Sequence, residues 1–445
     1  MRPEKVMISR ERFLSLILVA VFAAAAHGQA VAPLPTDKKV SDSYIYLLSR
    51  LLVLNQQQAD FDSGFKWNQL VHRKVGDVAW PNPNLDVAYS EAWVAIDDKS
   101  CALVSVPKVK DRYYTVQFLN GWGETVANIN ERVYPQHPDG EFAVCLKGAD
   151  IQLPKTTQRV DVSTTSLRVL SRVELGANRD EAVALQKRFN IHASGHPVVP
   201  EVPATVRFDI EKLPGVEAFE SATLALDSAA DTNPGMEKLQ ASTRAIARAI
   251  KEPGARQHVD QVIHQQAIPS IYKASPTLGD GTVKNGWAVP STIGVYGSNW
   301  LLRTLVNLGG IWANTYEEVI YYKGFVDPDG KPLNGDRAYA LRFEKDQLPS
   351  LYATHFWSVI AVDAVHRRVL PNPLKRYLLN NFSKLTYGED GSLTLYFGAT
   401  KPKGAPDGNW IPTPKGTGYS LTFRFYRPKG AVADRTYFPP GLKAQ

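Results

Sequence analysis

The residues with the clearest potential for chemistry lie in a segment rich in proline and asparagine, residues 80–89 (WPNPNLDVAY). Proline fixes φ, and Asn and Asp side chains can hydrogen-bond to nearby backbone, so the segment predicts a rigid polar corner that enters a strand at Val87. On this corner Asp86 could act as a general base, and Tyr89 as an acid or an orienting hydroxyl. The alternative is that Asp86 only stabilises the turn and Tyr89 lies in the core.

A second candidate site lies near the C-terminus, where residues 409–414 (NWIPTP) precede residues 419–426 (YSLTFRFY). Neighbouring prolines make Trp410 a stiff aromatic platform. Strand alternation in the second segment places four side chains on one face: Ser420, Thr422, Arg424 and Tyr426. A sheltered Arg424 could hold a carboxylate or sulfate through a bidentate contact; the alternative is a structural arginine that binds loop carbonyls or a carboxylate. The candidate substrate-binding residues are Arg424, Trp410, Asn409 and Trp357.

The usual catalytic signatures are absent from the sequence. It contains no G-x-S-x-G elbow, no H-E-x-x-H, no C-x-x-C, no Walker loop and no dinucleotide fingerprint. A Ser–His–Asp set could be drawn from Ser358, His355 and Asp363, but their spacing gives a triad no support. These absences disfavour the common hydrolases, zincins and nucleotide enzymes, while a site assembled from distant residues stays open.

The histidines give no clear metal-binding pattern. His192 and His196 are four positions apart, but Gly195 and Pro197 argue against the helix that would bring them together. We therefore predict no metal and no cofactor, although Asp and Glu could supply ligands that spacing does not reveal.

The two cysteines, Cys101 and Cys145, both fall in strand-like segments. In an oxidising compartment such a pair is more often a disulfide than a catalytic thiol. We predict the disulfide, on the condition that the two Cα atoms lie within about 7 Å of each other.

The N-terminus has the order of a secretory signal. A basic stretch precedes an apolar run at residues 13–26 (FLSLILVAVFAAAA), and small residues follow. The run is short for a membrane span of about 20 residues, so we predict a signal peptide at residues 1–28 and a periplasmic or secreted protein. An uncleaved membrane anchor is the alternative. No later run is long enough to predict a transmembrane segment in the mature chain.

Composition is that of a globular protein. The chain of 445 residues is 44% apolar and 10% aromatic, with a formal charge of +7. The leader contains four cations and two anions, which leaves +5 for the mature chain. Because no basic run interleaved with aromatics accompanies this charge, no nucleic-acid partner is predicted. A small-molecule or polymeric carbon-source ligand is the expected partner, and homo-oligomerisation is left open.

Short strand-like segments dominate the chain. The predicted strands are residues 87–96, 101–106, 113–119, 142–146, 165–173, 339–343, 355–362, 392–397 and 419–426. The predicted helices are residues 41–61, with Ser41 as N-cap, 180–189, 233–267 with a break at 253–254, and 298–322. The pattern predicts a mainly β fold with helical insertions (α+β): two β-sandwich or jelly-roll-like modules, 41–200 and 335–445, joined by a helical connector, 201–334.

Several motifs resemble known families. Residues 84–106 with the following Pro107, Arg112-Tyr113-Tyr114 with Gln117, and residues 166–174 resemble the bacterial domain-of-unknown-function family 1254. From about Gly335 onward, the motifs YALRF (339–343), FWS (356–358), DGSL (390–393), NWIPTP (409–414) and RFYRP (424–428), with Asn372 and Arg376-Tyr377, resemble its usual C-terminal companion, family 1214. The resemblance implies two β-sandwich or jelly-roll-like modules with helical insertions, often in secreted or periplasmic proteins, and implies no reaction.

The chain departs from the family pattern at two places. Val87 stands where the family usually has threonine, in Asn-x-Asp-Thr-x-Tyr. Before Phe356, residues 350–355 (SLYATH) replace the expected proline pair and small residue. If these positions line the family's cleft, the ligand of this chain differs.

Two functions from different classes fit these observations. The first is an exported, metal-independent hydrolase or lyase with a cleft between the β modules, in which Asp86 is the base, Tyr89 the acid and Arg424 the anion holder. The second is a periplasmic ligand-binding or envelope-interaction protein without chemistry.

Overall fold

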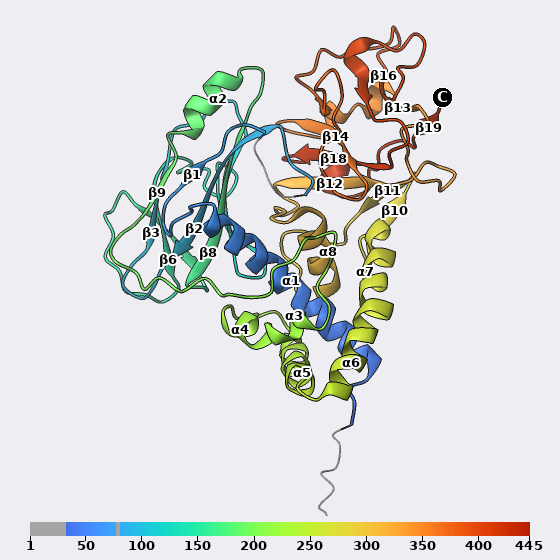
Figure 1. Ribbon diagram of the computed structural model, residues 1–445. Helices are drawn as coiled ribbons and strands as arrows, with labels where there is room; N and C mark the ends of the chain where they lie inside the picture. Colours follow the sequence, from blue (N-terminus) through green and yellow to red (C-terminus); the bar gives the residue numbers. More distant parts are fainter. Residues whose placement is uncertain (1–32, 77–80) are drawn as a thin grey trace, which may run out of the picture. The chain divides into compact units, whose positions relative to one another are not determined.

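The computed structural model describes residues 33–76 and 81–445. The predicted signal peptide, residues 1–28, and Trp80 of the proline-rich corner lie outside the described residues. Helices and strands contribute comparably, and the strands gather into two sheet-rich modules, which confirms the predicted α+β class (Figure 1).

The N-terminal module contains a five-stranded sheet in the order β1-β2-β8-β4-β5 and a four-stranded sheet in the order β7-β6-β3-β9. Its strands are β1 (Val71–His72), β2 (Val87–Ala95), β3 (Ala102–Val106), β4 (Tyr114–Leu119), β5 (Thr125–Ile129), β6 (Gly140–Leu146), β7 (Gln158–Val162), β8 (Ser166–Glu174) and β9 (Asn190–Ala193). Alternate side chains of both sheets, such as Val94, Val104, Phe142 and Val169, form one buried cluster, so the two sheets pack face to face.

The C-terminal module contains a six-stranded sheet, β10-β11-β12-β18-β14-β15, and a four-stranded sheet, β17-β16-β13-β19. Its strands are β10 (Thr282–Lys284), β11 (Trp287–Val289), β12 (Val319–Gly324), β13 (Tyr339–Phe343), β14 (Trp357–Asp363), β15 (Leu378–Asn380), β16 (Leu393–Gly398), β17 (Trp410–Pro412), β18 (Tyr419–Tyr426) and β19 (Lys443–Ala444). Its core includes Ile320, Leu341, Val359 and Phe423, which come from both sheets.

The helices between the modules surround α1 (Asp37–Asp62), drawn in blue in Figure 1. They are α3 (Glu217–Glu220), α4 (Ala222–Asp227), α5 (Met236–Ala249), α6 (Pro253–Val262), a π-helical turn (Ile263–Ala267), α7 (Ile268–Ala274) and α8 (Trp300–Gly310); α2 (Arg179–Gln186) and α9 (Gly430–Ala433) lie elsewhere. Leu47, Leu51 and Leu54 of α1 are fully buried among them. The helix begins four residues before the predicted Ser41, because Thr36 caps it by accepting a hydrogen bond from the Lys39 N–H at 3.4 Å.

The predicted helix at residues 298–322 is wrong in its second half. The helix α8 ends at Gly310, and the chain becomes strand β12 at Val319. Two consecutive glycines weaken the helix at its end, and the segment VIYY favours a strand because β-branched and aromatic residues pack well on a pleated surface. The strand β12 pairs along its whole length with β18, so residues that the sequence assigned to the connector form part of the C-terminal sheet.

A buried ion network ties α1 to the N-terminal sheet. The Arg168 guanidinium on β8 pairs with Glu91 on β2 and with Asp60 on α1, where Nη1 lies 3.2 Å from Oδ2. The guanidinium also lies over the rings of Trp93 and Trp312, at 5.1 and 5.5 Å from the centroids. Because Trp312 follows α8, this contact fixes the segment between α8 and β12.

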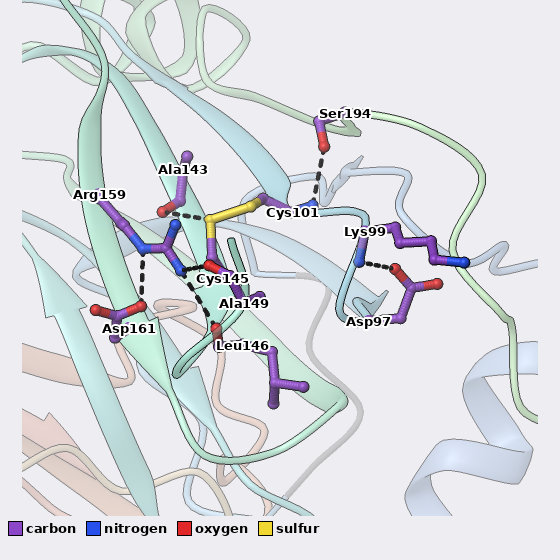
Figure 2. The surroundings of a disulfide bond; sticks show 10 residues. All are labelled: Asp97, Lys99, Cys101, Ala143, Cys145, Leu146, Ala149, Arg159, Asp161 and Ser194. Atoms are coloured by element: carbon purple, nitrogen blue, oxygen red, sulfur yellow. Dashed lines mark hydrogen bonds and ion pairs between the residues drawn. A yellow bond between two sulfur atoms is a disulfide. The ribbon is translucent and has the colours of Figure 1, made fainter. Parts of the chain in front are cut away.

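The predicted disulfide between Cys101 and Cys145 is confirmed (Figure 2). Ala102 pairs with Val144 in the antiparallel ladder of β3 and β6, so the two cysteines stand directly opposite each other, with a Cα–Cα distance of 4.5 Å. Ser194 fixes the adjacent backbone, since its Oγ accepts a hydrogen bond from the Cys101 N–H at 2.9 Å.

Within residues 33–76 and 81–445, no helix combines the length and the apolar character needed to cross a membrane. The same residues contain no group of three or more His, Cys, Asp or Glu side chains placed to hold a metal ion.

Candidate functional site

A cavity of about 460 Å³ lies between the six-stranded sheet of the C-terminal module and the helices. Its apolar wall comes mainly from α8 and the connector and includes Ile210, Leu278, Ile293, Leu305, Val306 and Ala313. The side chains of Tyr272 and Val365 are 44% and 64% exposed, so they mark the end that opens to solvent. The size is that of a pocket for a small molecule.

The polar wall of the cavity is one face of the sheet. The strand β18 contributes Ser420, Thr422 and Arg424, while the alternate residues of this strand point into the module core. The strand β12 contributes Tyr321 and Lys323, whose register partners are Arg424 and Thr422. The face of residues 419–426 that the sequence predicts to carry Ser420, Thr422 and Arg424 is therefore the face that lines the cavity.

Asn82 connects the proline-rich corner to this wall. Its side-chain oxygen accepts hydrogen bonds from Lys323 Nζ at 2.6 Å and from Thr422 Oγ1 at 3.0 Å, while its side-chain nitrogen donates to the Gly309 carbonyl of α8. Its backbone N–H donates to the Arg367 carbonyl at 2.8 Å. Asn82 has a φ of +52°, a conformation that asparagine tolerates better than most residues.

Arg424 is buried and binds loop carbonyls, as its structural interpretation expects. Its Nη2 donates to the backbone carbonyls of Asn82 and Pro83, at 3.0 and 3.2 Å, so the residue clamps the corner. Its Nη1 is buried and has no hydrogen-bond partner among the described residues, and the side chain as a whole is 2% exposed. One side of the guanidinium is thus used by the fold, and Nη1 is left without a partner among the described residues.

Two further basic side chains line the cavity, those of Lys323 and Arg367. Lys323 Nζ donates to Asn82 Oδ1 and, at 2.7 Å, to Thr422 Oγ1. Burial lowers the pKa of Lys323 well below its ordinary value, and the charges of Arg424 and Arg367 lower it further. Burial also lowers the pKa of Arg367.

The carboxylates of the described residues do not pair with the basic side chains of the cavity wall. Within residues 33–76 and 81–445, no carboxylate oxygen lies within 4 Å of a side-chain nitrogen of Lys323, Arg367 or Arg424. Glu211 is the acidic residue of the cavity wall, and its Oε1 contacts Nδ1 of the exposed His366. Arg367 and Arg424 therefore give the cavity wall a positive charge that no contacting carboxylate of the described residues cancels.

Asp86 lies behind Arg424 and does not contribute to the wall of the cavity. Asn380 Nδ2 donates to Asp86 Oδ1 at 2.8 Å, while Oδ2 is buried with no hydrogen-bond partner among the described residues. Burial raises the pKa of the Asp86 carboxyl, and nearby Ser358, Asn380 and Arg424 offset this rise only in part. The carboxyl thus has the raised pKa of a general base but lacks direct access to the cavity.

The pH dependence of stability tests this environment. Because the pKa of Asp86 is raised on folding, protonation of its carboxyl stabilises the folded state. This stabilisation is fully present below the unfolded pKa of about 3.9 and is lost as pH rises through the folded pKa. Asp86→Asn should therefore gain stability relative to wild type as pH rises from about 4 to 8. Urea denaturation at a series of pH values measures the difference. If the wild type instead gained stability relative to the variant over this range, the charge of Arg424 would outweigh burial in setting the pKa of Asp86.

Tyr89 lies on the wall of a smaller chamber of about 40 Å³ between the modules. The Arg172 guanidinium lies over the Tyr89 ring, 5.5 Å from its centroid. The chamber shares part of its wall with the main cavity, including Tyr321 and Arg424. The structure thus brings Tyr89 and Arg424 to one chamber, with Asp86 near Arg424 behind it.

The three remaining candidates lie away from both spaces. Asn409 Nδ2 donates to the carbonyls of Thr386 and Thr394, at 2.7 and 2.9 Å, and Trp410 Nε1 donates to the Gly398 carbonyl at 3.0 Å. Trp357 is 1% exposed in the C-terminal core. These contacts hold the module together, and none of the three side chains lines the cavity or the chamber.

The residues of the rejected triad do not assemble. His355 contacts Glu131, with Nε2 3.2 Å from Oε1, and Asp363 Oδ1 accepts hydrogen bonds from the backbone N–H groups of a turn, including Val365 at 2.8 Å. Ser358 instead pairs in register with Arg424, on the opposite side of its strand from the core.

Sequence reasoning missed Lys323, Arg367 and Arg172. A signal for Lys323 is present, because a strand at residues 319–324 places Tyr321 and Lys323 on the same face, but the predicted helix at residues 298–322 hides it. Arg367 lies in a turn and Arg172 on a buried strand, and no motif marks either of them.

Comparison with solved structures supports the fold. The crystal structure of the VPA0106 protein from Vibrio parahaemolyticus aligns with a TM-score of 0.62 and 19% identity, covering 92% of this chain and 99% of that one. A putative uncharacterized protein from Burkholderia cenocepacia aligns with a TM-score of 0.47 and 14% identity, covering 92% of this chain and 94% of that one. The likeness to the Vibrio parahaemolyticus protein, at 19% identity, shows a shared fold alone. A comparison with curated proteins gave no match.

Two family matches cover the two modules. Residues 67–193 match "Protein of unknown function (DUF1254)", and residues 318–430 match "Protein of unknown function (DUF1214)". The first match ends at the last strand of the N-terminal module, and the second extends from β12 to the start of α9. The chain therefore carries a region of the DUF1254 family followed by a region of the DUF1214 family, in the order that its sequence motifs indicate.

Proposed function

We propose that the protein binds a small amphipathic carboxylate in the main cavity. The observation that supports this proposal is the buried Nη1 of Arg424, which has no partner among the described residues and belongs to a residue of the cavity wall. A buried cation without a counter-charge is costly, and an anionic ligand group removes that cost. A carboxylate suits the planar donor fork of arginine.

The rest of the ligand should be apolar. Most of the wall opposite the sheet consists of aliphatic side chains, including Leu305 and Val306 of α8. Burial of an alkyl or aryl group against them contributes roughly 25 cal/mol per Å² of apolar surface. Arg424 and the apolar wall thus select together for a molecule with one acidic end and one hydrophobic end.

Titration calorimetry with octanoate, octanol and octylamine tests the proposal. We expect octanoate to bind, octanol to bind about tenfold or more weakly because it lacks the charge-assisted contact, and octylamine to show no binding. Val306→Trp, which fills the apolar wall, should abolish binding of octanoate. The proposal fails if octylamine binds as well as octanoate, or if octanoate does not bind to the folded wild type.

We also propose that the protein is exported to the periplasm or secreted. The leader-like sequence at residues 1–28 and the disulfide support this location, since disulfides persist mainly in oxidising compartments. In a bacterial host, protein from the envelope or medium should begin within a few residues of position 29. N-terminal sequencing that finds the full leader on protein from the cytoplasm would contradict the proposal.

An enzymatic role as a hydrolase or lyase is the second candidate for the same cavity. The position of Asp86 outside the cavity wall weakens its assignment as the base. The position of Lys323 on that wall favours instead the chemistry of an amine.

A further inference from the structure

We propose that Lys323 forms a reversible imine with the carbonyl group of an oxo acid held in the cavity. This inference rests on the proposed function, because the carboxylate of the same ligand would be held by Arg424. It goes beyond binding, since it assigns a nucleophile and restricts the ligand to carboxylates that also carry a ketone or aldehyde.

The hydrogen bonds of Lys323 fit a neutral amine. Its Nζ has two acceptors, Asn82 Oδ1 at 2.6 Å and Thr422 Oγ1 at 2.7 Å. Neither acceptor is charged, and a neutral amine has two N–H bonds to donate and one lone pair. Both N–H bonds are therefore used, and the lone pair is left for the cavity, whose wall includes Lys323.

The two acceptors are fixed by their own contacts. The Asn82 side-chain nitrogen donates to the Gly309 carbonyl, so the amide oxygen faces the lysine and the opposite orientation would lose this contact. The Thr422 hydroxyl donates to Asn82 Oδ1 at 3.0 Å, so it presents a lone pair to the amine. The nucleophile is thus oriented before a ligand arrives.

The charges around Lys323 favour the unprotonated form. Its charged neighbours are Arg424 and Arg367, both cations, and no carboxylate of the described residues lies within 4 Å of Nζ. Burial and these two charges lower the pKa of the ammonium. A lysine that is desolvated and close to another cation is a recognised form of activated nucleophile.

The sheet places the two functional groups at neighbouring positions. Lys323 on β12 pairs in register with Thr422 on β18, and Arg424 lies two residues further along the same face. Such diagonal neighbours lie within reach of each other for long side chains. An oxo acid whose carbonyl is adjacent to its carboxylate can therefore contact both residues.

The chemical step needs no further reactant. The Lys323 nitrogen attacks the carbonyl carbon and forms the C–N bond, and the carbonyl oxygen leaves as water with the two hydrogens of the amine. The product is an imine between Nζ and the ligand, and addition of water returns the free lysine and the oxo acid. No electron transfer takes place.

The test uses 2-oxooctanoate as the probe with the full mature chain. After incubation with 2-oxooctanoate and cyanoborohydride, which reduces an imine to a stable amine, intact mass and peptide mapping locate the adduct. We expect labelling of Lys323 at least about tenfold faster than of any other lysine, since each unit of lowered pKa raises the neutral fraction about tenfold. Octanoate should protect Lys323 from labelling. Lys323→Arg should lose this label, and Lys415→Arg, an exposed control on a turn, should retain it.

The outcomes separate this inference from the proposed function. If calorimetry shows that 2-oxooctanoate and octanoate both bind and no adduct forms on Lys323, the imine is refuted while the binding function stands. Labelling of Lys323 no faster than of the exposed lysines refutes it as well. If neither acid binds to the folded protein, both proposals fail.

Discussion

Replacing Arg424 with methionine is expected to weaken octanoate binding by roughly 30- to 150-fold, because hydrogen bonds to a charged group contribute about 2–3 kcal/mol. The substitution removes the buried Nη1 donor and the positive charge that the proposal assigns to the carboxylate. Titration calorimetry at constant pH and salt measures the change. Unchanged octanoate affinity in the folded variant would exclude Arg424 as the anion holder.

Two controls separate loss of the charge from damage to the fold. Arg342→Met removes an exposed arginine on the other sheet of the module, where it pairs with Glu344 and Asp390, and should leave octanoate binding unchanged. Arg424 also clamps the backbone of Asn82, so its loss could displace the corner. Octanol, which needs only the apolar wall, should bind Arg424→Met as it binds wild type. A loss of octanol binding equal to that of octanoate would show that the wall itself has moved.

Removal of the disulfide should cause the largest loss of stability. Cys101 and Cys145 are 44 residues apart in sequence, and closing a loop of this length restricts the unfolded chain by about 4 kcal/mol in the chain-entropy model. We therefore expect the double variant Cys101→Ser/Cys145→Ser to lose about 4 kcal/mol of unfolding free energy, measured by urea denaturation. A reductant should destabilise wild type to a similar extent and leave the double variant unaffected.

The same variant should retain its ligand. Both cysteines lie in the N-terminal module, and neither lines the cavity. At temperatures where the variant stays folded, its octanoate affinity should equal that of wild type. Thiol titration of unfolded, unreduced wild type should find close to no free thiol, and two free thiols per chain would contradict the disulfide.

The strands could be predicted because their side chains alternate in burial. In β18 the predicted and observed bounds are identical, and the face that carries Arg424 is the face that lines the cavity. The disulfide followed from the pairing of cysteines in strand-like segments. These features are local or nearly local, so a single sequence contains most of the information that they need.

The site could be predicted only in part, because it depends on contacts between distant segments. Asn82 and Lys323 are 241 positions apart and are brought together by packing of the corner against the sheet. An aromatic residue next to prolines looks the same in sequence whether it lines a cavity or a core, so the sequence predicts a binding platform at Trp410 although the residue lies away from the cavity. The helical spacing of apolar residues in 298–322 continued across the glycines at the end of α8, and this concealed β12 and with it Lys323.

Residue type alone does not decide whether Asp86 and Arg424 have structural or functional roles. Asn84 stabilises the corner, since its Oδ1 accepts a hydrogen bond from the Asp86 N–H at 2.8 Å, while the Asp86 carboxyl is buried near Arg424 and accepts a hydrogen bond from Asn380. Arg424 clamps loop carbonyls with one nitrogen and keeps the other without a partner among the described residues. A structural role and a functional role are therefore compatible in one side chain.

A crystal structure of the protein with octanoate tests the central claim most directly. The account predicts a carboxylate oxygen about 2.7–2.9 Å from Arg424 Nη1, the usual length of a charge-assisted hydrogen bond, with the alkyl chain against Leu305 and Val306. Octanoate bound in the reverse direction, with its carboxylate near Tyr272 and Val365, would contradict the account. So would octanoate bound outside the cavity while the cavity holds only water.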